Sequence, residues 1–169
     1  MIGIGIDIGS TAAKAAVVDG EGSVAWTCVQ PTGFSSVDAS ERLREALAAA
    51  GYDVAADDVR VIATGYGRVA VPYAHKVVTE ITCHARGAHH LDPAVRTVID
   101  IGGQDSKVIR LSESGAVETF AMNDKCAAGT GRFLDVISRT LGTTVEALDG
   151  ITDGIAPHPL TSMCTVFAE

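Results

Sequence analysis

Short runs of apolar residues alternate with polar or glycine-containing breaks along most of the chain, a pattern typical of β-strands joined by tight turns. Apolar residues at helical spacing follow each group of three strands, so helices are expected there. The expected strands are 2–8, 14–18, 23–29, 59–63, 97–101, 107–111 and 117–122. The expected helices are 38–50, 80–91, 127–141, one starting at 143 and one over 161–169. Strands followed by helices, twice over, predict an α/β duplication.

Two of these helices carry further expectations. Asp38 or Ser40 is expected to cap the first helix, because both residue types are good N-caps. In the helix over 127–141, the apolar residues at helical spacing are expected to face inward. They are Phe133, Leu134, Ile137 and Leu141.

The two groups of strands are copies of one pattern. Residues 6–24 align without a gap with residues 99–117, at a constant offset of 93, and seven of the nineteen pairs are identical. Each copy reads as a strand ending in Asp, a turn of small residues, a second strand and a turn that contains Gly. We therefore expect two subdomains, 1–93 and 94–169, with a hinge at Asp92-Pro93.

Composition fits a globular protein of this size, since 47% of the 169 residues are hydrophobic and 20% are charged. The formal net charge of −8 gives no electrostatic footprint for nucleic acid. No apolar run is long enough to cross a bilayer, and the N-terminus lacks the basic region of a signal peptide. We expect a cytoplasmic protein, in which the four cysteines are thiols or metal ligands before disulfides.

The small-residue turn of each copy is suited to phosphate, because phosphate oxygens need backbone N–H donors that can approach closely. The expected phosphate-binding residues are Gly9, Ser10, Thr11 and Lys14 in the first copy and Gly102, Gly103 and Gln104 in the second. The strand-end residues Asp7 and Asp100 are expected to hold Mg²⁺, directly or through water. Gln104, Asp100 or Asp7 is expected to orient an attacking water.

A single Asp-x-Gly turn is most often an ordinary strand end, but two copies in phase favour a clamp around one metal-bound polyphosphate. The chain has no G-x-x-x-x-G-K-[ST] loop, which excludes a P-loop enzyme. Its N-terminal glycines do not fit G-x-G-x-x-G either, so a Rossmann dinucleotide site is unsupported.

Two of the cysteines lie at the starts of expected helices, Cys126 just before 127–141 and Cys164 in the first turn of 161–169. A helix N-terminus stabilises a thiolate and favours an anionic ligand set. Two such cysteines from each of two chains would complete a four-thiolate site about a two-fold axis. Cysteines without C-x-x-C spacing are also common as buried apolar residues, and we interpret Cys28 and Cys83 as core.

The two Asp-Gly loops resemble the phosphate-1 and phosphate-2 motifs of the actin, hexokinase and heat-shock ATPase superfamily. Within it, five segments resemble the activators of 2-hydroxyacyl-CoA dehydratases and the related ATPase subunits of benzoyl-CoA reductase. They are 63–68, 80–85, 98–105, 122–134 and 164–169. The resemblance implies an α/β, actin-like (ribonuclease H-like) duplicated ATPase fold. Because family members continue well beyond residue 169, the second domain is expected to be incomplete.

The resemblance also implies a homodimeric ATPase that binds Mg-ATP or ADP. One [4Fe-4S] cluster is shared between its subunits, with Cys126 and Cys164 as ligands. Reduced ferredoxin or flavodoxin is the implied electron donor, and ATP hydrolysis drives the electron into a partner 2-hydroxyacyl-CoA dehydratase. Two other functions stay open: a sugar or acid kinase with incidental cysteines, and a non-hydrolysing cluster or dimerisation module.

Overall fold

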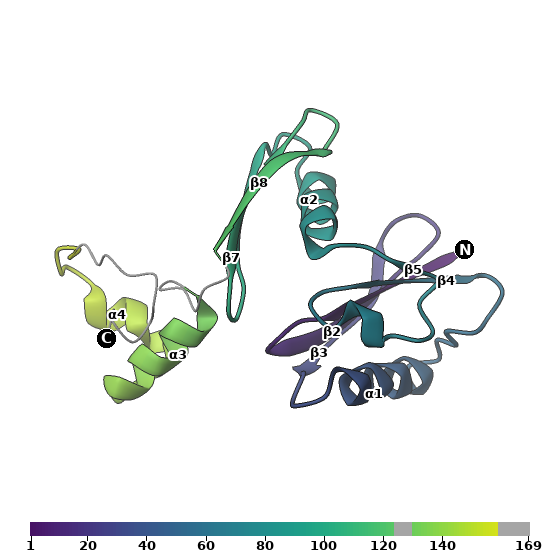
Figure 1. Cartoon of the computed structure of the whole chain (residues 1–169), viewed down its shortest axis with the longest axis horizontal. Helices are drawn as coiled ribbons and strands as arrows, with labels where there is room; N and C mark the ends of the chain where they lie inside the picture. Colours follow the sequence, from purple (N-terminus) through teal and green to yellow (C-terminus); the bar gives the residue numbers. More distant parts are fainter. Residues whose placement is uncertain (124–129, 159–169) are drawn as a thin grey trace. The chain divides into compact units, whose positions relative to one another are not determined.

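The computed structural model describes residues 1–123 and 130–158, which divide into two compact units (Figure 1). Unit 1 is Met1–Gly87 and unit 2 is Ala88–Glu169. The division lies within helix α2 (Glu80–Leu91). None of the helices in the described ranges is long and apolar enough to cross a membrane.

Unit 1 is built on a five-stranded sheet with the order β3-β2-β1-β4-β5. The strands are β1 (Ile2–Ile8), β2 (Ala12–Val18), β3 (Val24–Pro31), β4 (Val59–Thr64) and β5 (Lys76–Val77). β1, β2 and β3 form antiparallel hairpins, whereas β4 runs parallel to β1 on its other side. Parallel neighbours need a crossover connection, and α1 (Ser36–Ala49) lies within that connection. A short 3₁₀ turn, η1 (Arg68–Ala70), follows β4.

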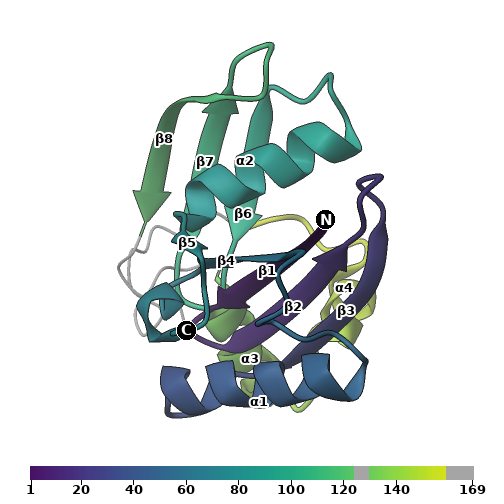
Figure 2. The same cartoon turned by 90° about the vertical axis from the view of Figure 1, so that its right-hand side faces the viewer.

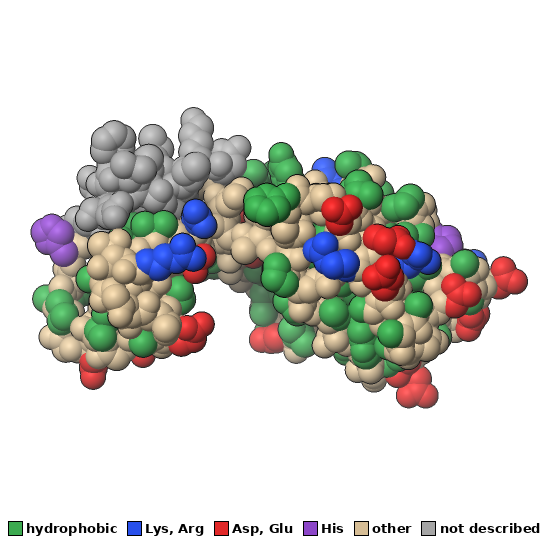
Figure 3. All heavy atoms as spheres, turned by 90° about the horizontal axis from the view of Figure 1, so that it is seen from below, with side chains coloured by type: hydrophobic (Ala, Val, Ile, Leu, Met, Phe, Trp, Pro, Cys, Tyr) green, Lys and Arg blue, Asp and Glu red, His purple; other side chains and the backbone are tan. Residues whose placement is uncertain are grey.

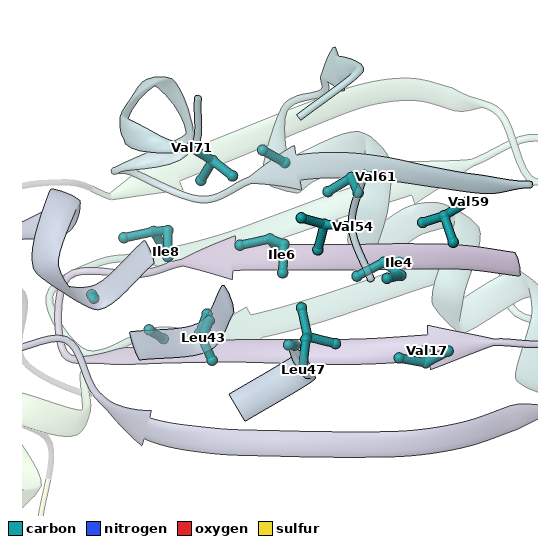
Figure 4. Close-up of a cluster of buried hydrophobic side chains, with 14 residues drawn as sticks. Ile4, Ile6, Ile8, Val17, Leu43, Leu47, Val54, Val59, Val61 and Val71 are labelled. Carbon is teal, nitrogen blue, oxygen red and sulfur yellow. The ribbon is translucent and has the colours of Figure 1, made fainter. Parts of the chain in front are cut away.

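The core of unit 1 lies between the sheet and α1, which runs along one sheet face (Figure 2). Side chains alternate along a strand, so every second residue of β1 points to that face. Ile4, Ile6 and Ile8 are at most 1% exposed, and they meet Leu43 and Leu47 of α1, which are fully buried (Figure 4). Each such side chain contributes roughly 1.5–3 kcal/mol by leaving water.

The cap of α1 differs from the expectation. Ser35 is the N-cap, and its side-chain oxygen accepts a hydrogen bond from the N–H of Asp38 at 3.1 Å. Asp38 lies in the first turn, where its charge complements the helix dipole. Ser40 faces the core, and its backbone carbonyl accepts a hydrogen bond from the hydroxyl of Tyr73 at 2.8 Å. The predicted caps Asp38 and Ser40 were therefore wrong.

Unit 2 contains a three-stranded antiparallel sheet in the order β6-β7-β8. Its elements are β6 (Thr97–Ile101), β7 (Ser106–Leu111), β8 (Val117–Asn123), α3 (Gly131–Thr140), η2 (Val145–Ala147) and α4 (Leu148–Thr152). Leu134 and Leu141, expected to face inward, are 36% and 57% exposed, whereas Phe133 and Ile137 are half-buried. The helix expected over 161–169 lies outside the described residues.

The two sheets differ in what surrounds the first strand of each repeat. In unit 1, β1 is paired on both sides and covered by α1. In the described part of unit 2, β6 pairs only with β7. Ile99 and Ile101 are 71% and 59% exposed, although their repeat equivalents Ile6 and Ile8, on the face of β1 that α1 covers, are fully buried.

Candidate phosphate-binding loops

Loop 1, residues 9–11, joins β1 to β2 in a tight turn. The N–H of Gly9 donates to the carbonyl of Ala12 at 3.0 Å and closes the turn. A Cβ atom at residue 9 would lie only 2.8 Å from the same carbonyl oxygen, so the turn requires glycine. The buried Thr32 holds the other side of loop 1. Its hydroxyl donates to the carbonyl of Gly9 at 2.7 Å, and its N–H donates to the carbonyl of Thr11 at 3.0 Å.

These contacts leave backbone donors in loop 1. In a planar trans peptide, the C=O of one residue and the N–H of the next point to opposite sides. Because Thr32 takes up the carbonyl of Gly9, the N–H of Ser10 points away from Thr32. Among the described residues, no backbone carbonyl accepts from the N–H of Ser10 or Thr11. Free N–H groups in a glycine turn are what phosphate oxygens bind.

Asp7 and Lys14 form a cross-strand pair beside loop 1. They are partners in the β1–β2 register, and Lys14 Nζ lies 3.0 Å from Asp7 Oδ2. The side chain of Lys14 is 43% exposed and that of Asp7 is 26% exposed, so the pair is accessible to solvent. On the other side of β1, Asp7 is aligned with Thr64 of β4. Gly65 follows at φ +87°, and a Cβ atom there would lie 2.2 Å from Asp7 Oδ1, so glycine is required.

Loop 2, residues 102–104, repeats this geometry in unit 2. The N–H of Gly102 donates to the carbonyl of Asp105 at 2.8 Å, the equivalent of the Gly9 bond at the offset of 93. Asp100 is aligned with Lys107 just as Asp7 is aligned with Lys14. The repeat detected in the sequence is therefore also a repeat of backbone register and of side-chain pairing.

The Asp100–Lys107 pair differs from the Asp7–Lys14 pair in its burial and in the presence of a second carboxylate. Lys107 Nζ lies 3.5 Å from Asp100 Oδ2 and 2.9 Å from Asp105 Oδ1, and the side chain is only 4% exposed. Asp105 occupies the repeat position of Ala12, so the second carboxylate has no equivalent in loop 1. Lys107 is therefore a buried cation held by two carboxylates, whereas Lys14 is half-exposed.

Two backbone N–H groups at the amino end of α3 bind loop 2. The N–H of Gly131 donates to the carbonyl of Gly102, and the N–H of Arg132 donates to the carbonyl of Gly103, both at 2.9 Å. By the same trans-peptide geometry, the N–H groups of Gly103 and Gln104 point away from α3. In the described part of the chain, no backbone carbonyl accepts from either of them.

The structure thus brings the predicted residues together within each unit. Loop 1 consists of Gly9, Ser10 and Thr11, and the paired side chains of Asp7 and Lys14 lie beside it. Loop 2 consists of Gly102, Gly103 and Gln104, and Asp100 lies beside it. Cys126 and Cys164 lie outside the described residues. Within the described ranges, no three His, Cys, Asp or Glu residues are grouped closely enough to hold one metal ion.

Several residues around the loops were not predicted. Lys107 could have been found, because it is one of the identical repeat pairs. Thr32 and Gly65 act through contacts with residues far away in the sequence, which spacing does not show. Asp105 is only two residues from Lys107, but the small-residue pattern of the turn gives no sign that its carboxylate pairs with that lysine. Cys28 and Cys83, expected in the core, are both half-buried, and Cys28 packs against the core of unit 1. On the face of unit 1 seen in Figure 3, acidic and basic side chains are interspersed.

Comparison with known proteins gives consistent matches. The model of the BadF/BadG/BcrA/BcrD ATPase family matches residues 4–169. The uncharacterized protein YjiL of Escherichia coli is 54% identical, covering 98% of this chain and 63% of its own length. The activator of lactoyl-CoA dehydratase from Anaerotignum propionicum is 45% identical, covering 100% of this chain and 65% of its own length.

A solved structure also matches closely. It is the activator of the 2-hydroxyisocaproyl-CoA dehydratase from Clostridium difficile with bound ADPNP, at a TM-score of 0.84 and 40% identity. The match covers 99% of this chain and 63% of that chain, so this chain spans less than two thirds of these relatives. The expected actin-like fold is confirmed, and the chain belongs to the BadF/BadG/BcrA/BcrD ATPase family.

Proposed function

We propose that this chain is the phosphate-binding part of an ATP-hydrolysing activator of a 2-hydroxyacyl-CoA dehydratase. One observation carries the proposal: both loops combine a strand-end Asp, a cross-strand Lys and free N–H donors in a glycine turn. The bound ADPNP of the Clostridium difficile activator supports a nucleotide as the ligand. The names of the similar activators support a dehydratase as the partner.

In this proposal the backbone of both loops binds phosphate oxygens. The N–H groups of Ser10 and Thr11 are the donors in loop 1, and those of Gly103 and Gln104 are the donors in loop 2. Lys14 can turn toward a phosphate because its side chain is 43% exposed and, among the described residues, pairs with the carboxylate of Asp7 alone. Lys107 is buried in its ion pairs, so it supports loop 2 and does not reach the ligand.

Asp7 and Asp100 are the proposed magnesium-binding residues. Each has one carboxylate oxygen near a lysine ammonium, and Asp7 Oδ1 faces the backbone at Gly65. That arrangement fits a hydrated Mg²⁺ held through water better than one held by several carboxylates, and Mg²⁺ retains waters readily. The ion would supply positive charge to the phosphates, and the exposed Gln104 would orient the attacking water.

We further propose that Cys126 and Cys164 from two copies of the chain hold one [4Fe-4S] cluster. Support comes from the donor set, since two thiolates per chain make four in a homodimer. The cluster would supply one low-potential electron, received from reduced ferredoxin or flavodoxin and passed to the dehydratase. This chain's own contribution is the contact between loop 2 and α3, which begins five residues after Cys126.

The proposal is tested by anaerobic reconstitution with iron and sulfide, followed by an iron count and a titration with Mg-ADPNP. A brown dimer with about four irons per two chains is expected. Asp7→Ala should lose nucleotide binding and keep the iron. Asp57→Ala is the matched control, because this exposed residue precedes β4 at the opposite end of the sheet from loop 1. A colourless monomer that binds no nucleotide would refute the proposal.

A further inference from the structure

The amino end of α3 donates its first two N–H groups to backbone carbonyls of loop 2. The first N–H groups of a helix have no intrahelical partner, so something else must bind them. Here the carbonyls of Gly102 and Gly103 do so, at 2.9 Å each. Thr130, the N-cap, is fully buried and makes no side-chain capping bond. The backbone contact with loop 2 therefore takes the place of a normal cap.

This contact also sets the orientation of loop 2. The peptide planes of loop 2 can rotate easily, because Gly102 and Gly103 have no side chain that restricts φ and ψ. Fixing the carbonyls of Gly102 and Gly103 fixes the two peptide planes that carry the N–H groups of Gly103 and Gln104. Without α3, those planes would be free to turn, and the two donors would lose their common direction.

Loop 1 is held differently. Its carbonyls are bound by Thr32, which lies between the end of β3 and the start of α1. In the described ranges, only loop 2 is bound by the backbone at a helix end. Loop 1 is thus fixed by the hydroxyl and the N–H of Thr32, whereas the geometry of loop 2 depends on α3.

We propose that Gly131 and Arg132 are positioning residues for nucleotide binding, an inference that rests on the proposed function. By holding the carbonyls of loop 2, they aim the N–H groups of Gly103 and Gln104 at the phosphates. Because coupling between two sites is reciprocal, a nucleotide on loop 2 also stabilises the first turn of α3. Nucleotide binding and the order of α3 depend on each other through these two hydrogen bonds.

Gly131 allows a sharp test, since it occupies the first helical position, where proline is well tolerated. Gly131→Pro removes the N–H and places a ring carbon where the hydrogen points at Gly102, so loop 2 must move. Thr130 already has the extended conformation that a residue before proline adopts, φ −91° and ψ 165°. Gly131→Ala is the matched control. It keeps the N–H, and its Cβ atom would lie 3.5 Å from Gly102 O, an ordinary contact.

Two measurements decide the question, the affinity for Mg-ADPNP and deuterium exchange of the 131–140 peptide with and without it. Gly131→Pro should bind about tenfold more weakly, because one hydrogen bond to a charged phosphate is worth about that factor. Added nucleotide should slow exchange in α3 for the wild type and for Gly131→Ala, but not for Gly131→Pro.

Equal affinity and equal protection of α3 in the proline and alanine variants would overturn this inference and leave the proposed function standing. A wild-type chain that binds no nucleotide would overturn both. If far-ultraviolet circular dichroism shows that Gly131→Pro is unfolded, the pair Arg132→Pro and Arg132→Ala repeats the test. In that pair, the proline variant removes the hydrogen bond to the Gly103 carbonyl and the alanine variant keeps it.

Discussion

Replacing the two repeat lysines should have very different effects on stability. Lys107→Met and Lys14→Met make the same chemical change at equivalent register positions, and methionine keeps most of the apolar stem. Lys107 is 4% exposed and lies near two carboxylates, whereas Lys14 is 43% exposed and lies near one. Burial and the number of partners are therefore the main variables.

The expected loss of stability follows from the distances between each lysine and its carboxylates. At an effective dielectric constant of about 20, an ammonium attracts a carboxylate about 3 Å away by roughly 5 kcal/mol. Desolvation of the buried ammonium offsets several kcal/mol of the attraction to Asp100 and Asp105. Removing the cation takes a partner from both Asp100 and Asp105 and leaves their like charges close together, so we expect Lys107→Met to cost about 3 kcal/mol. Lys14→Met should cost less than about 1 kcal/mol, as for other exposed pairs.

Deuterium exchange can assign each loss to its unit, because slowly exchanging amides report local and global opening energies. Lys107→Met should lower protection in β6, β7 and β8 and leave β1, β2 and β3 unchanged. Lys14→Met should change neither sheet by more than a small amount. Adding Asp105→Asn to Lys107→Met should recover part of the loss, because one of the two neighbouring negative charges is removed. Equal costs for the two lysine variants would refute the reasoning.

Three further predictions concern the core, the backbone beside loop 1 and the proposed chemistry. Leu43→Ala should lower the free energy of unfolding of unit 1 by about 2–5 kcal/mol, measured by urea denaturation. Val37→Ala, on the same helix but 63% exposed, should lower it by less than about 1 kcal/mol. Equal losses for the two variants would contradict the core described. Gly65→Ala should cost at least about 1–2 kcal/mol in the same assay from its positive φ alone, and a neutral result would contradict the close approach to Asp7. In the reconstituted protein, Cys126→Ser should lose iron and electron transfer while ATP hydrolysis continues. Asp7→Ala should keep the iron and lose ATP hydrolysis. Normal hydrolysis by Asp7→Ala would contradict the proposed role of Asp7 in binding Mg²⁺.

The strands and the repeat could be predicted because they follow from local patterns. Alternation of apolar residues located β1 and β6 at 2–8 and 97–101, and the offset of 93 aligned their loops. The α1 cap could not be chosen in the same way. Ser35, Asp38 and Ser40 all favour an N-cap, and only packing against Tyr73 shows that Ser40 belongs inside.

Burial was harder to predict than secondary structure. Lys14 and Lys107 are identical in the repeat, yet Asp105 in place of Ala12 gives Lys107 a second carboxylate partner in a buried site. Helical periodicity groups Leu134 and Leu141 with Phe133 and Ile137, yet Leu134 and Leu141 are exposed, because periodicity does not say which residues pack against that side of the helix. The second partner of Lys107 comes from one difference between the two copies, and the exposure of Leu134 and Leu141 depends on what packs against them, which helical periodicity does not record.

The edge of β6 also affects how this chain must be handled in solution. Among the described residues, that edge has no neighbouring strand, and Ile99 and Ile101 beside it are largely exposed. An open strand edge with exposed apolar residues invites pairing with another molecule and aggregation. A dimer seen by size exclusion can therefore arise from edge-to-edge association without any iron. Ile99→Lys would abolish such a dimer and spare one bridged by a cluster, so this variant belongs beside every measurement of oligomeric state.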